Sequence, residues 1–368
     1  MRIRLLLRDD YPAKSGGDLV LARAYEGALQ GVGLDARLEP LSAAGLDDRD
    51  GVAQVFNIDR WFEFVASARR IRASGRPLVV APIHHPMGAV DRFESGVRSG
   101  PLGVIGRAGR GPFGRERIKH AMRNRTGRSV AEALIRDPRA AIAQALTSAA
   151  LVVVQAPSET AEVQRNFGVD LGDKAVWVPN GVEVDDAVRI DGDRDIDVLL
   201  AGRIEERKNQ LSVAQAFAGT DVRVTFVGGD NPRNAAYTAA FHRLVAQHPN
   251  LTHVPHVPLE QLRSMYARSS VFLSVSHFEV VSLSELEAVG YGCRLVSGAN
   301  GYLRDYLGDR ATYVDPAIDA ERLRSVVAAS LGLGVDEEAV RLVRAEYTWA
   351  RTARDLVGAY RGADLLPA

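Results

Sequence analysis

Two glutamates, Glu279 and Glu287, lie eight positions apart in the stretch HFEVVSLSELEAVGYG (277–292), which changes from strand-like to helix-like. Ser282 and Glu285 fit the S-x-x-E pattern of a capping box, so they predict a helix that begins at Ser282 and is capped by Glu285. One glutamate near a helix start is ordinary, because acids favour the positive end of the helix dipole. A pair of glutamates flanked by apolar residues calls for a further explanation.

The position of this helix start suggests what the two carboxylates do. The strand VFLSVS (271–276) precedes it, which puts Glu279 at the carboxyl edge of a strand, where open α/β sheets bind ligands. The first N–H groups of the helix, at Leu283 and Ser284, lack partners within the helix and favour a phosphate. Glu287, further along the helix, can accept both hydroxyls of a ribose. This order of hydroxyl, phosphate and hydroxyl sites suits a sugar nucleotide.

Two cations follow another expected strand. The segment GRIEERKNQ (202–210) comes directly after DVLLA. Arg203 can make a forked pair of hydrogen bonds and Lys208 supplies a point charge, a combination that suits a diphosphate. The alternative is that both cations pair at the surface with Glu205 and Glu206.

The first half of the chain holds two further candidate sites. Gly16 and Gly17 lie between the first expected strand and the first helix, where the backbone and the helix N-terminus can approach an anion. A glycine pair in a loop is also typical of a plain turn, and its spacing is not that of a dinucleotide fingerprint. His84 and His85 follow the strand LVVAPI (78–83). We expect His84 to face the ligand; the alternative is a histidine that only caps the strand.

The composition excludes several classes of protein. Lys plus Arg and Asp plus Glu both total 46, so the formal net charge is zero. This balance argues against nucleic acid as the main partner. Cys293 is the single cysteine, which excludes an internal disulfide framework and a cysteine-cluster metal site. No apolar run approaches the roughly 20 residues of a membrane span, and the first strand is too short for a signal peptide. We expect a cytoplasmic, globular protein.

The chain alternates strand-like and helix-like segments in two series. The expected strands are RIRLLLR (2–8), AQVFNI (53–58), LVVAPI (78–83) and LVVVQAP (151–157), followed after residue 195 by DVLLAGR, VRVTFVGG, VFLSVS, CRLVSG and ATYVDP. Helix-like stretches such as DLVLARAYEGALQGVG (18–33) lie between them. Such alternation predicts parallel sheets covered on both faces. We therefore expect an α/β protein with two Rossmann-like domains that face each other across a cleft.

An acidic, non-periodic stretch, EVDDAVRIDGDRDID (183–197), marks the expected domain boundary. We expect an N-terminal acceptor domain over 1–182 and a C-terminal donor domain over 183–346. The tail, 347–368, contains a segment of helical period. It is predicted to form a helix that returns to the N-terminal domain.

One segment is strongly basic. Residues 107–128 hold eight Lys and Arg side chains against one acid, Glu116. The segment is either a solvated helical face and loop, or a surface for an anionic acceptor or an anionic membrane. In the second case the protein would make peripheral contact with the inner face of the membrane.

Taken jointly, these motifs resemble family 4 glycosyltransferases, which are retaining enzymes of the GT-B architecture. WVPNGVEV (177–184) is similar to the hinge strand of the family, and LLAGRIEERKNQ (199–210) to its phosphate segment. FEVVSLSELEAVGYGCRLV (278–296) is similar to the family's E-x7-E motif. The resemblance covers most of the chain and is strongest over 175–316.

The resemblance implies transfer of a sugar from a nucleotide-sugar donor to an acceptor hydroxyl on a glycan, a lipid-linked molecule or a small glycoside. It implies retention by front-face attack, with the leaving phosphate taking the proton of the acceptor. The catalytic set that it implies is Glu279, His84, Arg203 and Lys208. The donor-binding set is Gly16, Gly17, Arg203, Lys208, Glu279, Ser282, Leu283, Ser284 and Glu287.

No metal or other cofactor is expected besides the nucleoside-diphosphate sugar itself. Arg203 and Lys208 already offer positive charge to the leaving diphosphate. The D-x-D pattern at Asp191–Asp193 lies in the expected linker rather than after a strand. This context argues against a metal-dependent GT-A enzyme.

The sequence departs from the family pattern at several positions, and two other functions remain open. Val280 and Ser282 replace two glycines, and Arg294 replaces a proline. A non-catalytic protein that binds nucleotide sugars is one alternative. A sugar-nucleotide epimerase on the same fold, with His84 or His85 as its acid or base, is the other.

Overall fold

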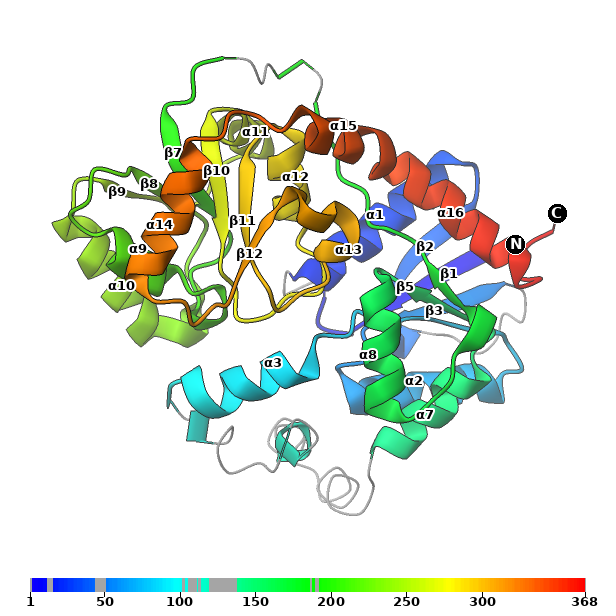
Figure 1. The fold of residues 1–368 in the computed structure, drawn as a ribbon. Helices are drawn as coiled ribbons and strands as arrows, with labels where there is room; N and C mark the ends of the chain where they lie inside the picture. The colour runs from blue at the N-terminus through cyan, green and yellow to red at the C-terminus, as the bar shows by residue number, and fades with distance from the viewer. Residues whose placement is uncertain are drawn as a thin grey trace. The chain divides into compact units, whose positions relative to one another are not determined.

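The computed structural model describes residues 2–11, 16–43, 51–100, 103–104, 111, 114–118, 138–185, 187–188 and 192–367. The chain divides into two compact units (Figure 1). Unit 1 consists of Met1–Gly181 and Trp349–Ala368, and unit 2 of Val182–Thr348. In the described part of each unit, helices cover a six-stranded parallel sheet.

Unit 1 is built around a sheet of order β2-β1-β3-β4-β5-β6. Its strands are β1 (Arg2–Leu7), β2 (Asp35–Pro40), β3 (Val52–Phe56), β4 (Leu78–Ala81), β5 (Leu151–Val154) and β6 (Ala175–Trp177). Its described helices are α1 (Gly17–Gly31), α2 (Trp61–Ala73), α3 (Met87–Arg92), α7 (Pro138–Ser148), α8 (Pro157–Phe167) and α16 (Trp349–Gly362). The central strands β3, β4 and β5 are buried along their whole length. Their continuous apolar sequence is typical of parallel strands that helices cover on both faces.

Unit 2 repeats this plan with the order β12-β11-β10-β7-β8-β9. Its strands are β7 (Ile196–Ala201), β8 (Val224–Val227), β9 (Leu251–Val254), β10 (Ser269–Ser274), β11 (Arg294–Gly298) and β12 (Thr312–Val314). Its helices are α9 (Gln210–Phe217), α10 (Ala235–Gln247), α11 (Leu259–Ala267), α12 (Leu283–Gly290), α13 (Arg304–Leu307), α14 (Ala320–Leu331) and α15 (Glu337–Glu346). Phe217, Phe226 and Phe241 are completely buried in the core between the sheet and the α9, α10 and α14 layer.

The strand order of each sheet creates a switch point. In unit 2 the chain runs from β7 through β8 to β9 and then starts again on the other side of β7 with β10. In unit 1 it runs from β1 to β2 and then starts again beside β1 with β3. Open α/β sheets bind ligands outside the carboxyl ends of the two strands that flank such a point. The loops after β7 and β10, and those after β1 and β3, are therefore the places where a site is expected.

The expectation of an α/β protein with two Rossmann-like parallel sheets is confirmed. The expected strands did not include β2, β6 or β9, whose sequences are DARLEP, AVW and LTHV. Each lies at the edge of its sheet. An edge strand has only one paired side and carries polar residues toward solvent, so the apolar runs that mark central strands are absent from it.

The C-terminal helix α16 packs in unit 1 beside α1 (Figure 1). Its buried stripe includes Ala353, Leu356 and Tyr360. The Tyr360 hydroxyl donates a hydrogen bond to Oε1 of Gln54, on β3. The last helix of the chain therefore completes the core of the unit that begins the chain.

Most of the basic segment 107–128 lies outside the described residues. Within the described part, Arg115 is buried and pairs with Asp91. This side chain therefore does not belong to a solvated face. Among the described residues, no helix is both long and apolar enough to cross a membrane.

Replacing Leu356 with alanine should destabilise unit 1 by about 2–5 kcal/mol, because it removes a fully buried side chain and leaves a cavity. All three tryptophans of the chain, Trp61, Trp177 and Trp349, belong to unit 1. Urea unfolding followed by tryptophan fluorescence therefore reports on the unfolding of unit 1. Arg354→Ala, an exposed position of the same helix, is the control. Equal unfolding midpoints for L356A and R354A would contradict the packing described for α16.

Candidate functional site

The loops after β7 and β10 meet through their backbones and through a cluster of charges. The His277 N–H donates to the Arg207 carbonyl at 2.8 Å. Glu279 Oε1 accepts hydrogen bonds from Arg207 Nη1 and from Lys208 Nζ, both at 2.6 Å. Residues 70 to 72 positions apart are thus joined at the switch point, because β7 and β10 are paired neighbours in the sheet.

Arg207 is the cation of this cluster that our reading of the sequence missed. Glu205 Oε1 accepts from its Nη2 at 3.0 Å, and the guanidinium lies over the Phe278 ring at 5.6 Å. Burial opposes its charge, but Glu279 and Glu205 outweigh burial, so the pKa of Arg207 is raised. The signal available in the sequence was a second cation directly beside Lys208.

Arg203 lies apart from this contact. Its side chain is half exposed, and its Nη2 lies 3.9 Å from Glu205 Oε2, which is the surface pairing that was the alternative for this residue. The structure therefore brings Lys208 to Glu279 and leaves Arg203 at the surface. The alternative for Lys208 was surface pairing with Glu205 or Glu206; in the structure Lys208 instead bonds to Glu279.

The carboxyl end of β8 packs closely against the loop after β7. Gly228 has a φ of +145°, and a Cβ there would lie 2.1 Å from the Gly202 carbonyl oxygen. Only glycine fits this position without a shift of the backbone. The loop that carries Lys208 is therefore supported from the neighbouring strand.

The predicted capping box at Ser282 and Glu285 is wrong. Ser282 is the N-cap residue of α12, but its side chain makes no capping hydrogen bond. Its hydroxyl lies 3.0 Å from that of Ser284. Glu285 Oε2 instead accepts a hydrogen bond from the Ser297 hydroxyl, on β11, at 2.7 Å. The buried side of the helix offers Glu285 hydroxyl partners, and these tertiary contacts replace the local one.

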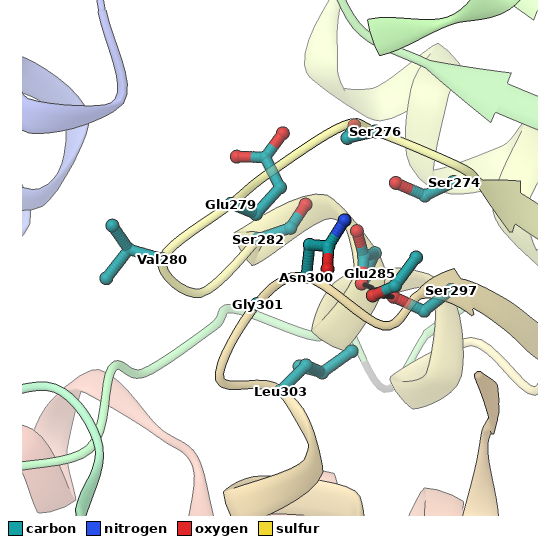
Figure 2. Close-up of a pocket in the computed structure, with 11 residues that line it drawn as sticks. Ser274, Ser276, Glu279, Val280, Ser282, Glu285, Ser297, Asn300, Gly301 and Leu303 are labelled. Carbon is teal, nitrogen blue, oxygen red and sulfur yellow. Dashed lines mark hydrogen bonds between the residues drawn. The ribbon is translucent and has the colours of Figure 1, made fainter. Parts of the chain in front are cut away.

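Glu285 lies in the wall of a polar pocket (Figure 2). The residues that line the pocket come from the ends of β10 and β11, from the start of α12 and from the loops beside them. They are Ser274, Ser276, Glu279, Val280, Ser282, Glu285, Ser297, Gly298, Asn300, Gly301 and Leu303. Glu285 is only 2% exposed. Burial raises the pKa of its carboxyl to about 7, although Ser274 and Ser297 partly counteract this by hydrogen bonding.

Glu287 lies two residues after Glu285 on α12. Its Oε2 accepts a hydrogen bond from the Tyr266 hydroxyl, on α11, at 3.3 Å. Burial raises the pKa of this carboxyl to about 7, and the Tyr266 hydroxyl and the charge of Arg263 act in the opposite direction. Glu279 and Glu287 therefore have different partners: two cations hold the first, and a phenol contacts the second.

The glycine loop of unit 1 lies at the other switch point, directly before α1. A Cβ at Gly16 would lie 2.6 Å from Asp18 Oδ1 and 3.2 Å from Arg8 Nη2. Arg8 is buried and pairs through Nε with Asp18 at 2.8 Å. The absence of a side chain at Gly16 makes room for this ion pair. Gly17, the first residue of α1, is exposed.

His84 has a different environment from the one expected. Its side chain is completely buried, with Nδ1 bonded to Asp59 and Nε2 placed 2.9 Å from Asn166 Nδ2. His85 is about a quarter exposed, and its Nδ1 lies 2.7 Å from the other Asp59 oxygen. Burial opposes the charge of Asp59, but the two histidines outweigh it and lower the pKa of this carboxyl. The role assigned to His84 stays a prediction.

Glu285 should make the stability of unit 2 depend on pH. Its folded-state pKa is about 7 against an ordinary value of 4.5, so between these values the folded state keeps a proton that the unfolded chain has lost. This contribution to the free energy of unfolding is complete below about pH 4.5 and is lost as the pH rises through 7.

Glu285→Gln removes this titration. From pH 5 to pH 7.5, wild-type unit 2 should lose about 2 kcal/mol of stability relative to the variant. Hydrogen exchange of the amides in β10 and β11 measures it. Glu321→Gln, an exposed position on α14, is the control. If E285Q and the wild type change in parallel with pH, the environment described for Glu285 is wrong.

Comparisons with known proteins address the family and the fold. Residues 185–346 match the model of the family described as glycosyl transferases group 1. A glycogen synthase from Desulforudis audaxviator is 32% identical over 191 residues, which are 46% of this chain and 37% of that protein. The chain thus spans little more than a third of the length of the curated relative that it matches. Both Glu279 and Lys208 lie inside the matched segment of the family.

Solved structures resemble the chain over nearly its whole length. A sucrose-phosphate synthase from Thermosynechococcus elongatus has a TM-score of 0.72 at 15% identity, with 98% of each chain covered. HepE from Anabaena, in complex with UDP, has a TM-score of 0.67 at 12% identity and covers 98% of this chain and 100% of its own. Identities this low show the fold alone. The chain therefore has the GT-B fold, and its unit 2 carries the match to the group 1 glycosyl transferases.

Proposed function

We propose that this protein is a retaining glycosyltransferase of family 4 that transfers a sugar from a nucleoside-diphosphate sugar to an acceptor hydroxyl. The cluster of Glu279, Lys208 and Arg207 carries the proposal. It lies at the switch point of unit 2, where the loop after β7 meets the loop that leads into α12. The segment that contains it matches the group 1 glycosyl transferases.

The charges of this cluster suit a leaving diphosphate. During transfer the bond between the sugar and the phosphate oxygen breaks, and negative charge develops on the diphosphate. Lys208 and Arg207 offer two positive charges to it, and the start of α12 at Leu283 and Ser284 offers backbone N–H groups. The exposed Arg203 is a third cation of the same segment. With these cations in place, the proposal needs no metal ion.

In this proposal Glu279 and Glu287 bind different parts of the donor. Glu279, held at Oε1 by both cations, contacts the transferred sugar. Glu287, beside the Tyr266 hydroxyl, accepts the ribose hydroxyls. The start of α12 lies between them in the sequence, as the diphosphate lies between the two sugars of the donor.

Retention follows, in this proposal, from attack on the face that the diphosphate leaves. The acceptor oxygen bonds to the anomeric carbon while the bond to the phosphate oxygen breaks. The proton of the acceptor moves to that phosphate oxygen. No side chain is assigned as a nucleophile. We propose that unit 1 binds the acceptor, and that Gly16 and Gly17 contact the donor from that unit.

A panel of nucleotide sugars tests the reaction class. HepE, one of the proteins of similar fold, has been solved with UDP and with UDP-glucose, so uridine donors are tested first. Release of nucleoside diphosphate together with a glycosylated acceptor supports the proposal. An isomerised donor would indicate an epimerase, and binding without turnover would indicate a binding protein. Either of these outcomes contradicts the proposal.

Glu279→Ala and Lys208→Ala should each lower kcat/KM for transfer by about 100-fold or more, since each removes a contact that stabilises the transition state. Glu260→Ala, at an exposed position on α11, is the control and should retain wild-type activity. Rates of E279A and K208A within about threefold of the wild type would show that the site is placed wrongly.

A further inference from the structure

The pocket between α12 and the carboxyl ends of β10 and β11 is rich in hydroxyl groups. Ser274 ends β10, Ser276 follows it, Ser297 lies on β11 and Ser282 precedes α12. Figure 2 shows Ser274, Ser282 and Ser297 beside the Glu285 carboxyl, and Ser276 on the stretch that leads to Glu279. Three elements of unit 2 thus bring their hydroxyls to one place, next to the carboxylate that we assign to the transferred sugar.

Ser276 is the exceptional member of this group. It is 3% exposed, and its hydroxyl has no hydrogen-bond partner among the described residues. A buried hydroxyl without a partner costs roughly 1–3 kcal/mol. By contrast, the Ser297 hydroxyl is satisfied by Glu285 at 2.7 Å. Ser276 therefore holds an unused donor and acceptor in the lining of a pocket that also includes Glu279.

The charges around the pocket decide what kind of group fits it. Glu279 and Glu285 belong to its lining, and its lining residues include no lysine or arginine. A phosphate or a carboxylate finds no cation in this lining and is better served by Lys208 and Arg207, which lie on the other loop. A neutral hydroxyl, which both donates and accepts, matches serine hydroxyls and a buried carboxyl.

We propose that this pocket is a subsite that recognises one hydroxyl group of the transferred sugar, with Ser276 as the contacting residue. This subsite rests on the proposed function. It adds the side chain, Ser276, by which the enzyme would distinguish one donor sugar from another. The sugar hydroxyl completes the hydrogen bonding of Ser276 and lies against the wall formed by Glu285. A donor that lacks this hydroxyl leaves Ser276 unpaired, and a site built in this way discriminates strongly against such analogues.

Ser276→Ala tests the subsite. The wild type and S276A are compared with the nucleotide sugar that the wild type uses best, and with the same donor deoxygenated in turn at C2, C3, C4 and C6. S276A should lower kcat/KM for the parent donor by about fivefold to tenfold, the usual loss for one hydrogen bond. With one of the deoxy donors the two proteins should have equal kcat/KM, because the contact is already absent.

Two controls separate this effect from a general loss of structure. Ser212→Ala, at an exposed position on α9, should match the wild type with every donor. The melting temperature of S276A should not fall, because the removed hydroxyl has no partner in the protein. A lower melting temperature together with equal losses for every donor would assign Ser276 a structural role and overturn the subsite.

The outcomes also distinguish the two proposals. If the wild type turns over no nucleotide sugar, the proposed function is contradicted. If the wild type transfers sugar but S276A retains full kcat/KM for the parent donor, the subsite alone is contradicted. The same conclusion follows if the ratio between the two proteins is the same for every deoxy donor.

Discussion

The parallel pairing of β7 with β10 is the constraint on which the site in unit 2 depends. Because these strands are neighbours with their carboxyl ends at one edge, the loops that follow them must meet. The backbone bond from His277 to Arg207 and the bonds from both cations to Glu279 are consequences of this pairing. A chain whose fourth strand joined the other edge of the sheet would separate these charges.

Both units contain buried carboxyl groups whose pKa is raised. Glu159 in unit 1 and Glu285 and Glu287 in unit 2 all have a pKa raised to about 7, in each case chiefly by burial. Each accepts hydrogen bonds from backbone or hydroxyl groups, which limits the penalty. Glu279 differs because two cations contact it directly. The carboxyl groups near the site in unit 2 therefore divide into two whose pKa is raised by burial and one, Glu279, that two cations contact.

Unit 1 shows how one carboxylate can organise two histidines. Asp59 follows β3 and uses one oxygen for His84 and the other for His85. Such sharing orients both rings and keeps the carboxylate charged. The two histidines differ in exposure: His84 is completely buried, and His85 stays partly at the surface.

The sequence alone determined the fold class and the loops of the site. Long apolar runs such as LVVA and LVVV predict central parallel strands. Lys208 and Glu279 lie in the loops that follow two other strands of this kind, β7 and β10, which places both residues at the same edge of the sheet. The direction of a side chain is decided by what packs against it, and only the tertiary structure supplies that. Glu285 fits a local capping pattern, yet Ser297, on a strand that comes later in the chain, offers it a better partner. For the same reason, the part of Arg207 in the cluster and the burial of His84 were not visible in the sequence.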